Sequence, residues 1–167
     1  MSIKFPNFLA MVLLTGLLGA CSNNDSTNPN GGTNNGIIVT DALSGNWSVC
    51  NQFTGTSTYF RETYSNNTFT RIKGDFTNNT CSGQPANGYQ ELYYGTYDIG
   101  AEIAAGIYEL DLHMERAFGA PLTYDLYELY SIQSNTLYHG DASTGVGDTP
   151  ANRPTALDTI NVFYLEN

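Results

Sequence analysis

The residues with the clearest chemical potential lie in segment 105–114, where Glu109, Asp111 and His113 alternate with apolar residues. Alternate side chains of a β-strand share one face, so these three would lie side by side on a strand. Two carboxylates and an imidazole at this spacing indicate a small metal or acid–base cluster. We favour the competing interpretation, a solvated outer face, because acidic alternation needs no further cause.

A second candidate is the segment from His139 to Asp148, which also contains Asp141, Gly145 and Gly147. Oxygen ligands on a glycine-containing loop can wrap Ca²⁺. However, this segment lacks the alternating Asp or Asn ligands and the terminal Glu of a known calcium-binding loop. We therefore favour an ordinary flexible loop and assign no metal ligand.

The sequence contains none of the common catalytic signatures. Gly-x-Ser-x-Gly, His-Glu-x-x-His and a glycine-rich phosphate loop are all absent, and His113 and His139 are the only histidines. We predict no catalytic residues, no cofactor and no enzymatic activity.

A short apolar segment that ends in a cysteine opens the chain. Lys4 precedes an apolar run from Phe8 to Ala20, and Cys21 follows directly. This run is too short for a transmembrane helix, which needs about 20 residues to cross a ~30 Å hydrocarbon core. Its end, Leu17-Leu18-Gly19-Ala20-Cys21, resembles the lipobox of a bacterial lipoprotein signal peptide.

This resemblance implies that residues 1–20 are removed and that the Cys21 sulfur and the new N-terminus are acylated, for example with palmitate. A plain secretory peptide is the alternative, but it would not require a cysteine at this position. By resemblance to Gram-negative lipoproteins, a residue other than Asp after the cysteine, here Ser22, implies an outer-membrane location. More than one acyl chain would anchor the protein stably.

With Cys21 lipidated, Cys50 and Cys81 remain as a pair in an oxidising compartment. We predict a disulfide between them. A metal or redox pair is the weaker interpretation, since the chain has no Cys-x-x-Cys spacing.

The charge balance excludes some partners. Cleavage would remove Lys4 and leave five Lys and Arg residues against 16 Asp and Glu. Nucleic-acid binding needs clustered cations, as does electrostatic docking on anionic lipid, so we predict neither. The only membrane contact that we expect is the lipid anchor.

Segment 21–36 begins with the lipidated cysteine, and its residues 22–36 are rich in Asn, Gly, Ser and Thr and should form a disordered tether of about 20 Å. One domain should occupy residues 37–167. It is predicted to be all-β, because Tyr, Phe and Thr are abundant and Gly or Asn interrupts the chain at short intervals. The expected strands are 45–53, 57–65, 67–77, 89–99, 105–114, 122–133, 135–139 and 158–165.

Tight turns are expected at Asn66-Asn67 and Ser134-Asn135. In segment 122–133 both faces carry apolar residues, so this strand should be covered on both sides at one end. A single helical turn would fit 101–105. Short consecutive strands favour an antiparallel up-and-down meander that closes into a small barrel of about eight strands. A β-sandwich is the alternative.

Several short motifs resemble the small lipocalin-like domains of bacterial lipoproteins. The first is Gly45-Asn46-Trp47, similar to the Gly-x-Trp that opens the first strand of lipocalins. The others are Cys50 with Cys81, 95–100, 124–127, 135–138 and 153–158. The resemblance implies a lipocalin-like barrel in which Trp47 seals the closed end, Arg153 packs across its ring as a cation–π cap, and a ligand enters from the opposite end.

Two functions remain open at this level. A lipocalin-like barrel would bind a small apolar or amphipathic ligand, with some of the 12 tyrosines lining its pocket. Alternatively, a packed barrel would serve as a structural or interaction lipoprotein that contacts an envelope protein or glycan. A cavity of a few hundred Å³ would favour the first function and a filled core the second.

Overall fold

The fold is known from a computed structural model, which describes residues 42–167. The predicted signal peptide, Cys21 and the tether at 21–36 lie outside the described residues. Within the described part, no helix is both long and apolar enough to cross a membrane.

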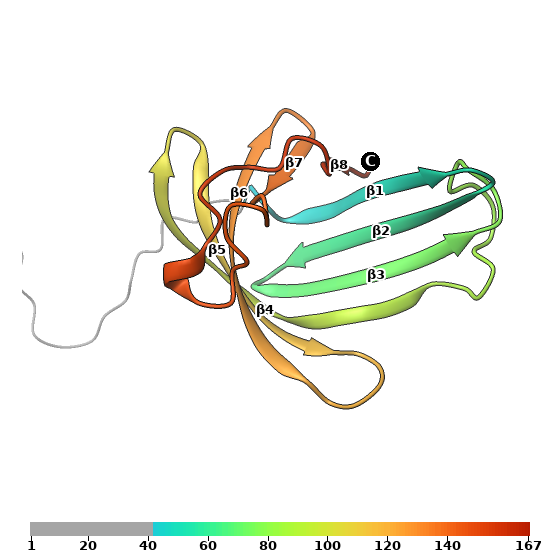
Figure 1. Ribbon diagram of the computed structural model, residues 1–167, viewed down its shortest axis with the longest axis horizontal. Coiled ribbons are helices and arrows are strands. Elements are labelled where there is room, and N and C mark those ends of the chain that lie inside the picture. Colours follow the sequence, from blue (N-terminus) through green and yellow to red (C-terminus); the bar gives the residue numbers. More distant parts are fainter. Residues whose placement is uncertain (1–41) are drawn as a thin grey trace, which may run out of the picture. The chain divides into compact units, whose positions relative to one another are not determined.

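Eight antiparallel strands, each paired with its neighbours in sequence, close into a barrel (Figure 1). The strands are β1 (Gly45–Phe53), β2 (Thr56–Ser65), β3 (Thr68–Phe76), β4 (Gln90–Ala104), β5 (Ile107–Arg116), β6 (Thr123–Gln133), β7 (Thr136–His139) and β8 (Phe163–Leu165). The barrel closes where Trp47 of β1 pairs with Leu165 of β8. The predicted meander and barrel are confirmed, and the alternative of a β-sandwich is wrong.

The two predicted tight turns lie at one end of this barrel. Asn66 and Asn67 join β2 to β3 with φ of 48° and 62°, and Ser134 joins β6 to β7 with φ of 57°. Two successive residues with positive φ match the right-handed twist of a hairpin, and Asn tolerates this conformation better than most residues. These local turns fix the register of their strand pairs.

Two predicted boundaries are wrong. Strand β4 continues to Ala104, and Glu102 pairs with Tyr108, so residues 101–105 do not form a helical turn. The last strand contains only Phe163–Leu165, whereas residues 158–162 belong to a loop. In that loop the Asp158 carboxylate accepts hydrogen bonds from the backbone N–H groups of Ile160 and Asn161, which curls the chain out of an extended conformation.

Buried aromatic and aliphatic side chains fill the end of the barrel at which β1 begins. Trp47 is 2% exposed, and its Nε1 donates a hydrogen bond to the Leu43 carbonyl at 2.7 Å. The Tyr64 ring packs against Phe69 and Tyr97 at centroid distances of 5.1 and 5.2 Å. This end is therefore closed by side chains, and Trp47 is buried there as the sequence predicted.

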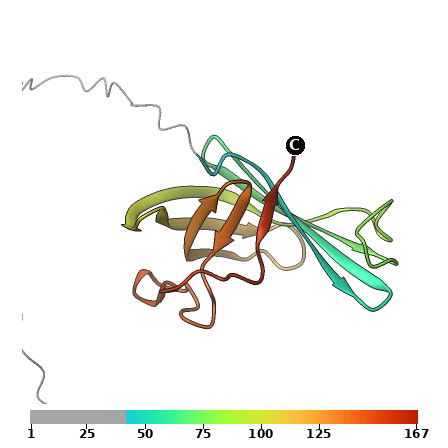
Figure 2. The same ribbon diagram turned by 90° about the horizontal axis from the view of Figure 1, so that it is seen from above.

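The predicted disulfide joins Cys50 of β1 to Cys81 in the β3–β4 loop. That loop folds onto the outer face of β1–β3, where Tyr89 packs edge-on against Tyr59 and Phe76. In the chain-entropy model, closing a 31-residue loop stabilises the fold by about 3.5–4 kcal/mol. The disulfide thus holds an outer layer on strands that extend past β5–β7 in both ribbon views (Figure 1, Figure 2).

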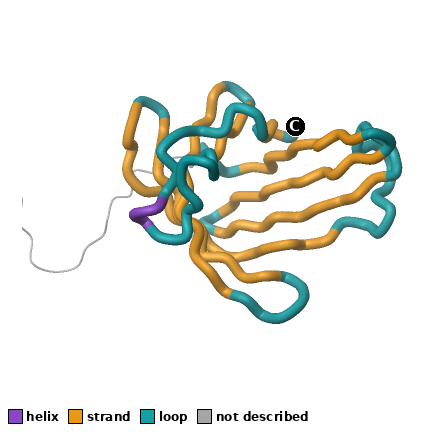
Figure 3. The backbone as a smooth tube through the Cα atoms, in the orientation of Figure 1, coloured by secondary structure: helices purple, strands orange, loops and turns teal. Residues whose placement is uncertain are grey.

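A second outer layer comes from the β7–β8 loop, residues 140–162, which includes a short 3₁₀ helix at Pro150–Asn152 (Figure 3). It pairs with the edge of β6 that β7 leaves open, through the hydrogen bond from Tyr127 N to the Gly147 carbonyl at 2.8 Å, and its Arg153 lies over the outward-facing ring of Tyr127. Leu129, on the same outer face of β6, is only 1% exposed. Strand β6 is therefore covered on both faces, as its sequence predicted.

Candidate functional site

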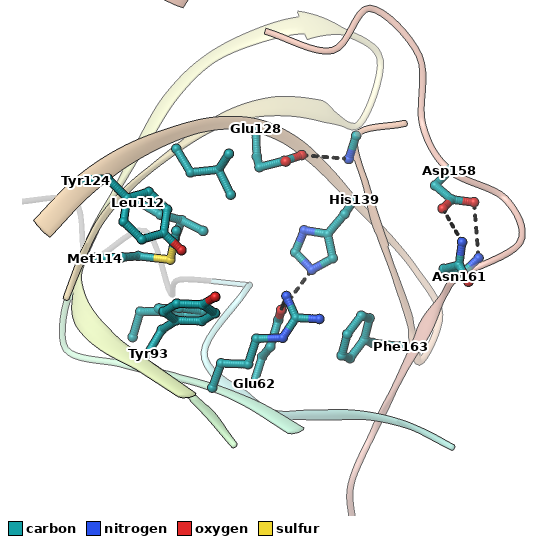
Figure 4. Close-up of a pocket in the computed structure, with 14 residues that line it drawn as sticks. Glu62, Tyr93, Leu112, Met114, Tyr124, Glu128, His139, Asp158, Asn161 and Phe163 are labelled. Atoms are coloured by element: carbon teal, nitrogen blue, oxygen red, sulfur yellow. Dashed lines mark hydrogen bonds and ion pairs between the residues drawn. The ribbon is translucent and has the colours of Figure 1, made fainter. Parts of the chain in front are cut away.

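A cavity of about 200 Å³ lies inside the barrel, beyond the filled closed end (Figure 4). Its lining comes from the seven strands β2–β8 and from the β7–β8 loop. The lining residues are Glu62, Phe69, Arg71, Tyr93, Leu112, Met114, Tyr124, Leu126, Glu128, His139, Gly140, Asp158, Asn161 and Phe163. The barrel is thus packed in one half and hollow in the other.

One wall of the cavity is apolar and aromatic. It is built by Leu112 and Met114 of β5, Tyr124 and Leu126 of β6, and Tyr93 of β4. The Tyr93 and Tyr124 rings meet edge to face at 5.8 Å. Burial, followed by the hydrogen bond with Tyr93, raises the pKa of Tyr124 to about 12, so its hydroxyl is neutral at ordinary pH. This wall offers apolar surface with two hydroxyl groups at its edge.

The opposite wall carries a buried carboxylate with three partners. Glu62 of β2, whose side chain is 4% exposed, accepts a hydrogen bond from Tyr64 at 3.0 Å. The same carboxylate lies 2.8 Å from His139 Nε2 and 3.4 Å from an Arg71 guanidinium nitrogen. Figure 4 shows the imidazole of His139 on the cavity wall, joined to Glu62. These contacts bring β2, β3 and β7 together around one negative charge.

The electrostatics of this cluster favour charged Glu62 and His139. Burial alone would raise the pKa of Glu62, but the charge and hydrogen bond of His139 and the charge of Arg71 outweigh it and lower that pKa to about 2. Burial alone would lower the pKa of His139, yet the charge and hydrogen bond of Glu62, and then the charge of Glu128, raise it above its ordinary value. The two residues form an ion pair inside the barrel.

Glu128 of β6 supplies a second carboxylate to the cavity. Its Oε2 accepts a hydrogen bond from the backbone N–H of Gly140 at 3.2 Å. A side chain at position 140 would bring its Cβ within 2.7 Å of that oxygen and 2.6 Å of Pro154, so glycine permits this approach. Burial raises the pKa of Glu128, only partly offset by His139. This carboxyl group is therefore easier to protonate than a solvated one.

The residues first considered for chemistry lie elsewhere, on the outer face of β5. Arg153 contacts Glu109 at 3.5 Å and Asp111 at 2.6 Å. His113 contacts Asp125 at 2.7 Å and Asp98 at 3.4 Å across the neighbouring strands. The three residues thus belong to two separate ion-pair groups on a partly exposed surface.

The β7–β8 loop uses its acidic groups locally. Asp141 accepts a hydrogen bond from the Ser143 N–H, and Asp148 accepts one from the Asn152 side chain. In residues 42–167, no group of three or more His, Cys, Asp or Glu side chains is arranged to hold a metal ion.

The predicted role of Arg153 as a cap on Trp47 is wrong. Its guanidinium lies over the Tyr127 ring at 5.5 Å and donates hydrogen bonds to the carbonyls of Leu110 and Glu128 at 3.2 and 2.6 Å. The reason is the path of the β7–β8 loop, which covers the outer face of β5 and β6, whereas Trp47 points inward. Arg153 instead fastens this loop to the barrel wall.

Gly45, the other residue of the predicted barrel-end motif, has a structural role. Its φ is 146°, and a Cβ at this position would lie 3.0 Å from a Leu165 methyl group. Glycine therefore lets β1 begin close to β8 at the closed end.

The central residues of the cavity, Glu62 and Arg71, were not predicted from sequence. The available signal was alternation: Phe60, Glu62 and Tyr64 share one face of β2, so a carboxylate stands between two aromatic side chains. Glu128 stands among apolar residues on its face of β6, and His139 is one of only two histidines in the sequence. Their meeting depends on the register of strands that are distant in sequence.

A scan of protein-family models and searches of curated proteins and solved structures return no match to this chain.

Proposed function

We propose that the domain is a binding module that takes a small amphipathic molecule into the barrel cavity. The observation that carries this proposal is the division of one cavity of about 200 Å³ into an apolar aromatic wall and a charged wall. A ligand with an apolar body and a polar head would match both walls at once. Ligand pockets typically combine such apolar surface with a few convergent polar groups.

The cost of the charged wall supports this function over a purely structural barrel. Burying Glu62 and His139 removes both from water, and well-packed apolar residues of similar volume would often be at least as stable. The closed end of the same barrel is filled mainly with apolar and aromatic side chains, including Leu43, Trp47 and Phe69. The polar groups are thus concentrated where there is space for a ligand.

A cavity-filling substitution tests the proposal. Leu126→Trp should block binding of 2-phenylethanol, a neutral amphipathic molecule, because Leu126 lines the cavity. Leu122→Trp is the matched control, since Leu122 is exposed in the β5–β6 loop. Ligand-observed NMR with the folded proteins should detect binding to the wild type and the control but not to Leu126→Trp. Equal binding to all three, or none to the wild type, would refute the proposal.

We further propose that the protein works at the bacterial outer membrane, held there by a lipidated Cys21. The apolar run before Cys21 and the lipobox resemblance support this location. In this arrangement the domain projects from the envelope on the tether at 21–36. Native mass spectrometry of protein purified from its own envelope would then identify the natural ligand.

Replacement of Cys21 with Ser should remove the lipid and release the chain from the membrane, or block its processing. Membrane fractionation and intact mass measure both outcomes. A variant that still partitions into the membrane and still begins at residue 21 would contradict lipidation.

A further inference from the structure

Arg71 is the least satisfied charged group on the cavity wall. Its Nε atom is buried and has no hydrogen-bond partner within the described structure. Its recorded charge contact, to Glu62, is 3.4 Å long, whereas a charge-assisted hydrogen bond normally measures about 2.7–2.9 Å. A guanidinium has five N–H donors, so Arg71 has donors left for a ligand.

Two aromatic rings fix the position of this guanidinium. Its central carbon lies 5.1 Å from the centroid of Phe60 in β2 and 5.8 Å from that of Phe163 in β8. Such cation–π contacts orient the planar group before any ligand arrives. The Arg71 side chain is also 34% exposed, so the head group of an entering ligand can reach it.

The neighbouring carboxylates, Glu62 and Glu128, do not fully neutralise the positive charge of Arg71. Glu62 already receives hydrogen bonds from Tyr64 and His139, which share its negative charge with Arg71. Glu128 bonds to the Gly140 N–H, and its raised pKa lets it take up a proton beside an incoming anion. An acceptor group on the ligand would therefore complete the coordination of Arg71, whereas an ammonium group could not pair with it.

The size of the cavity limits the rest of the ligand. An engineered apolar cavity of about 150 Å³ binds benzene. The present cavity of about 200 Å³ has room for one ring, or a branched chain of that size, and a small head group. The Tyr93 and Tyr124 rings, with Met114, provide the surface against which such a body would pack.

We propose that the ligand is a compact carboxylate with a single-ring or branched apolar body, and that its carboxylate pairs with Arg71. This inference rests on the proposed binding function and adds the chemical class of the ligand. The two oxygens of a carboxylate can accept two parallel hydrogen bonds from the planar guanidinium. A hydroxyl or an amine cannot form this two-point contact.

Three molecules with the same ring and different head groups test this inference: phenylacetate, 2-phenylethanol and 2-phenylethylamine. Isothermal titration calorimetry at constant pH and ionic strength should show phenylacetate binding at least about tenfold more tightly than the alcohol, as a charge-assisted pair would give. The amine should bind most weakly. If the alcohol binds and phenylacetate has no advantage, the inference fails while the cavity function stands. If none of the three binds, both fail.

Substitution of Arg71 tests whether this residue causes the preference for phenylacetate. Arg71→Gln should abolish the advantage of phenylacetate and leave binding of 2-phenylethanol within about twofold. Arg61→Gln is the matched control, because it removes the same charge at a nearby position. Arg61 precedes Glu62, the residue of β2 that pairs with Arg71, and it lies on the outer face beside Glu166. Its phenylacetate affinity should be unchanged.

Arg71→Lys keeps the charge without the planar fork, so it should retain only part of the preference. Circular dichroism confirms that each variant folds before titration. If Arg71→Gln is unfolded, the preference for phenylacetate over 2-phenylethanol is compared between Arg71→Lys and the wild type instead. Loss of the preference in Arg61→Gln, or its full retention in either Arg71 variant, would overturn the role of Arg71.

Discussion

Trp47→Ala is expected to lower the free energy of unfolding by about 3–5 kcal/mol, the usual range for truncating a large buried aromatic side chain. Trp47 is 2% exposed, pairs across the sheet with Glu62 and Leu165, and donates a hydrogen bond to Leu43. Its removal would open a cavity where β1, β2 and β8 meet, at the seam that closes the barrel. Urea unfolding followed by far-UV circular dichroism measures the change.

Tyr164→Ala is the matched control for this substitution. Tyr164 lies on β8 next to Leu165, and its side chain is 55% exposed. Its loss should change the unfolding free energy by no more than about 0.5 kcal/mol. Because Trp47 is the only tryptophan, wild-type fluorescence offers a second measurement. A loss below about 1 kcal/mol in Trp47→Ala, or emission like that of free indole with easy iodide quenching, would contradict a sealing role.

Local sequence patterns were sufficient to predict most of the barrel. Alternating apolar and polar residues indicate strands, and a pair of asparagines such as 66–67 indicates a turn with positive φ. Each of these signals is contained in a few consecutive residues, so it can be read without knowing the rest of the fold. With Cys21 set aside as the predicted lipidation site, Cys50 and Cys81 were the only pair left, and the structure joins them in a disulfide. The late start of the last strand, at Phe163 rather than at residue 158, was missed, because the turn at Asp158 depends on three hydrogen bonds to its carboxylate rather than on an apolar pattern.

The site was harder to predict than the fold for a physical reason. The alternation of residues along a strand shows which residues share a face. It does not show which face is inside the barrel when both faces carry charged and aromatic residues. Glu62 and His139 are 77 positions apart and meet only when the barrel closes. Arg153 could be recognised as an anchoring cation, but its partners depend on whether its loop crosses the inside or the outside of the barrel.

The Glu62–His139 pair is expected to make stability strongly dependent on pH. Glu62 has a folded pKa of about 2, below its unfolded value of about 4.3. Its contribution is therefore present above the unfolded pKa and lost as pH falls toward 2. A difference of about two pKa units corresponds to about 3 kcal/mol.

His139 has a raised folded pKa, so its contribution is present below about 6.5 and lost as pH rises through the folded value. The pair should stabilise the barrel most between about pH 5 and 6.5.

Glu62→Gln should accordingly lower the free energy of unfolding by about 3 kcal/mol near pH 6. This is the low end of the range for breaking a buried ion pair, because His139 can lose its proton in response. Thermal unfolding from pH 3 to 9 should show a flatter profile than the wild type on both sides of this maximum. Glu115→Gln is the matched control, since it removes the same charge from an exposed position of β5.

Other carboxylates with lowered pKa values, Asp75 and Asp158, titrate in both variants, so the difference between the two profiles isolates Glu62. Parallel profiles for Glu62→Gln and Glu115→Gln would show that the buried pair does not stabilise the fold. Such a result would also remove the reason for Arg71 to be held beside Glu62 at the wall of the cavity.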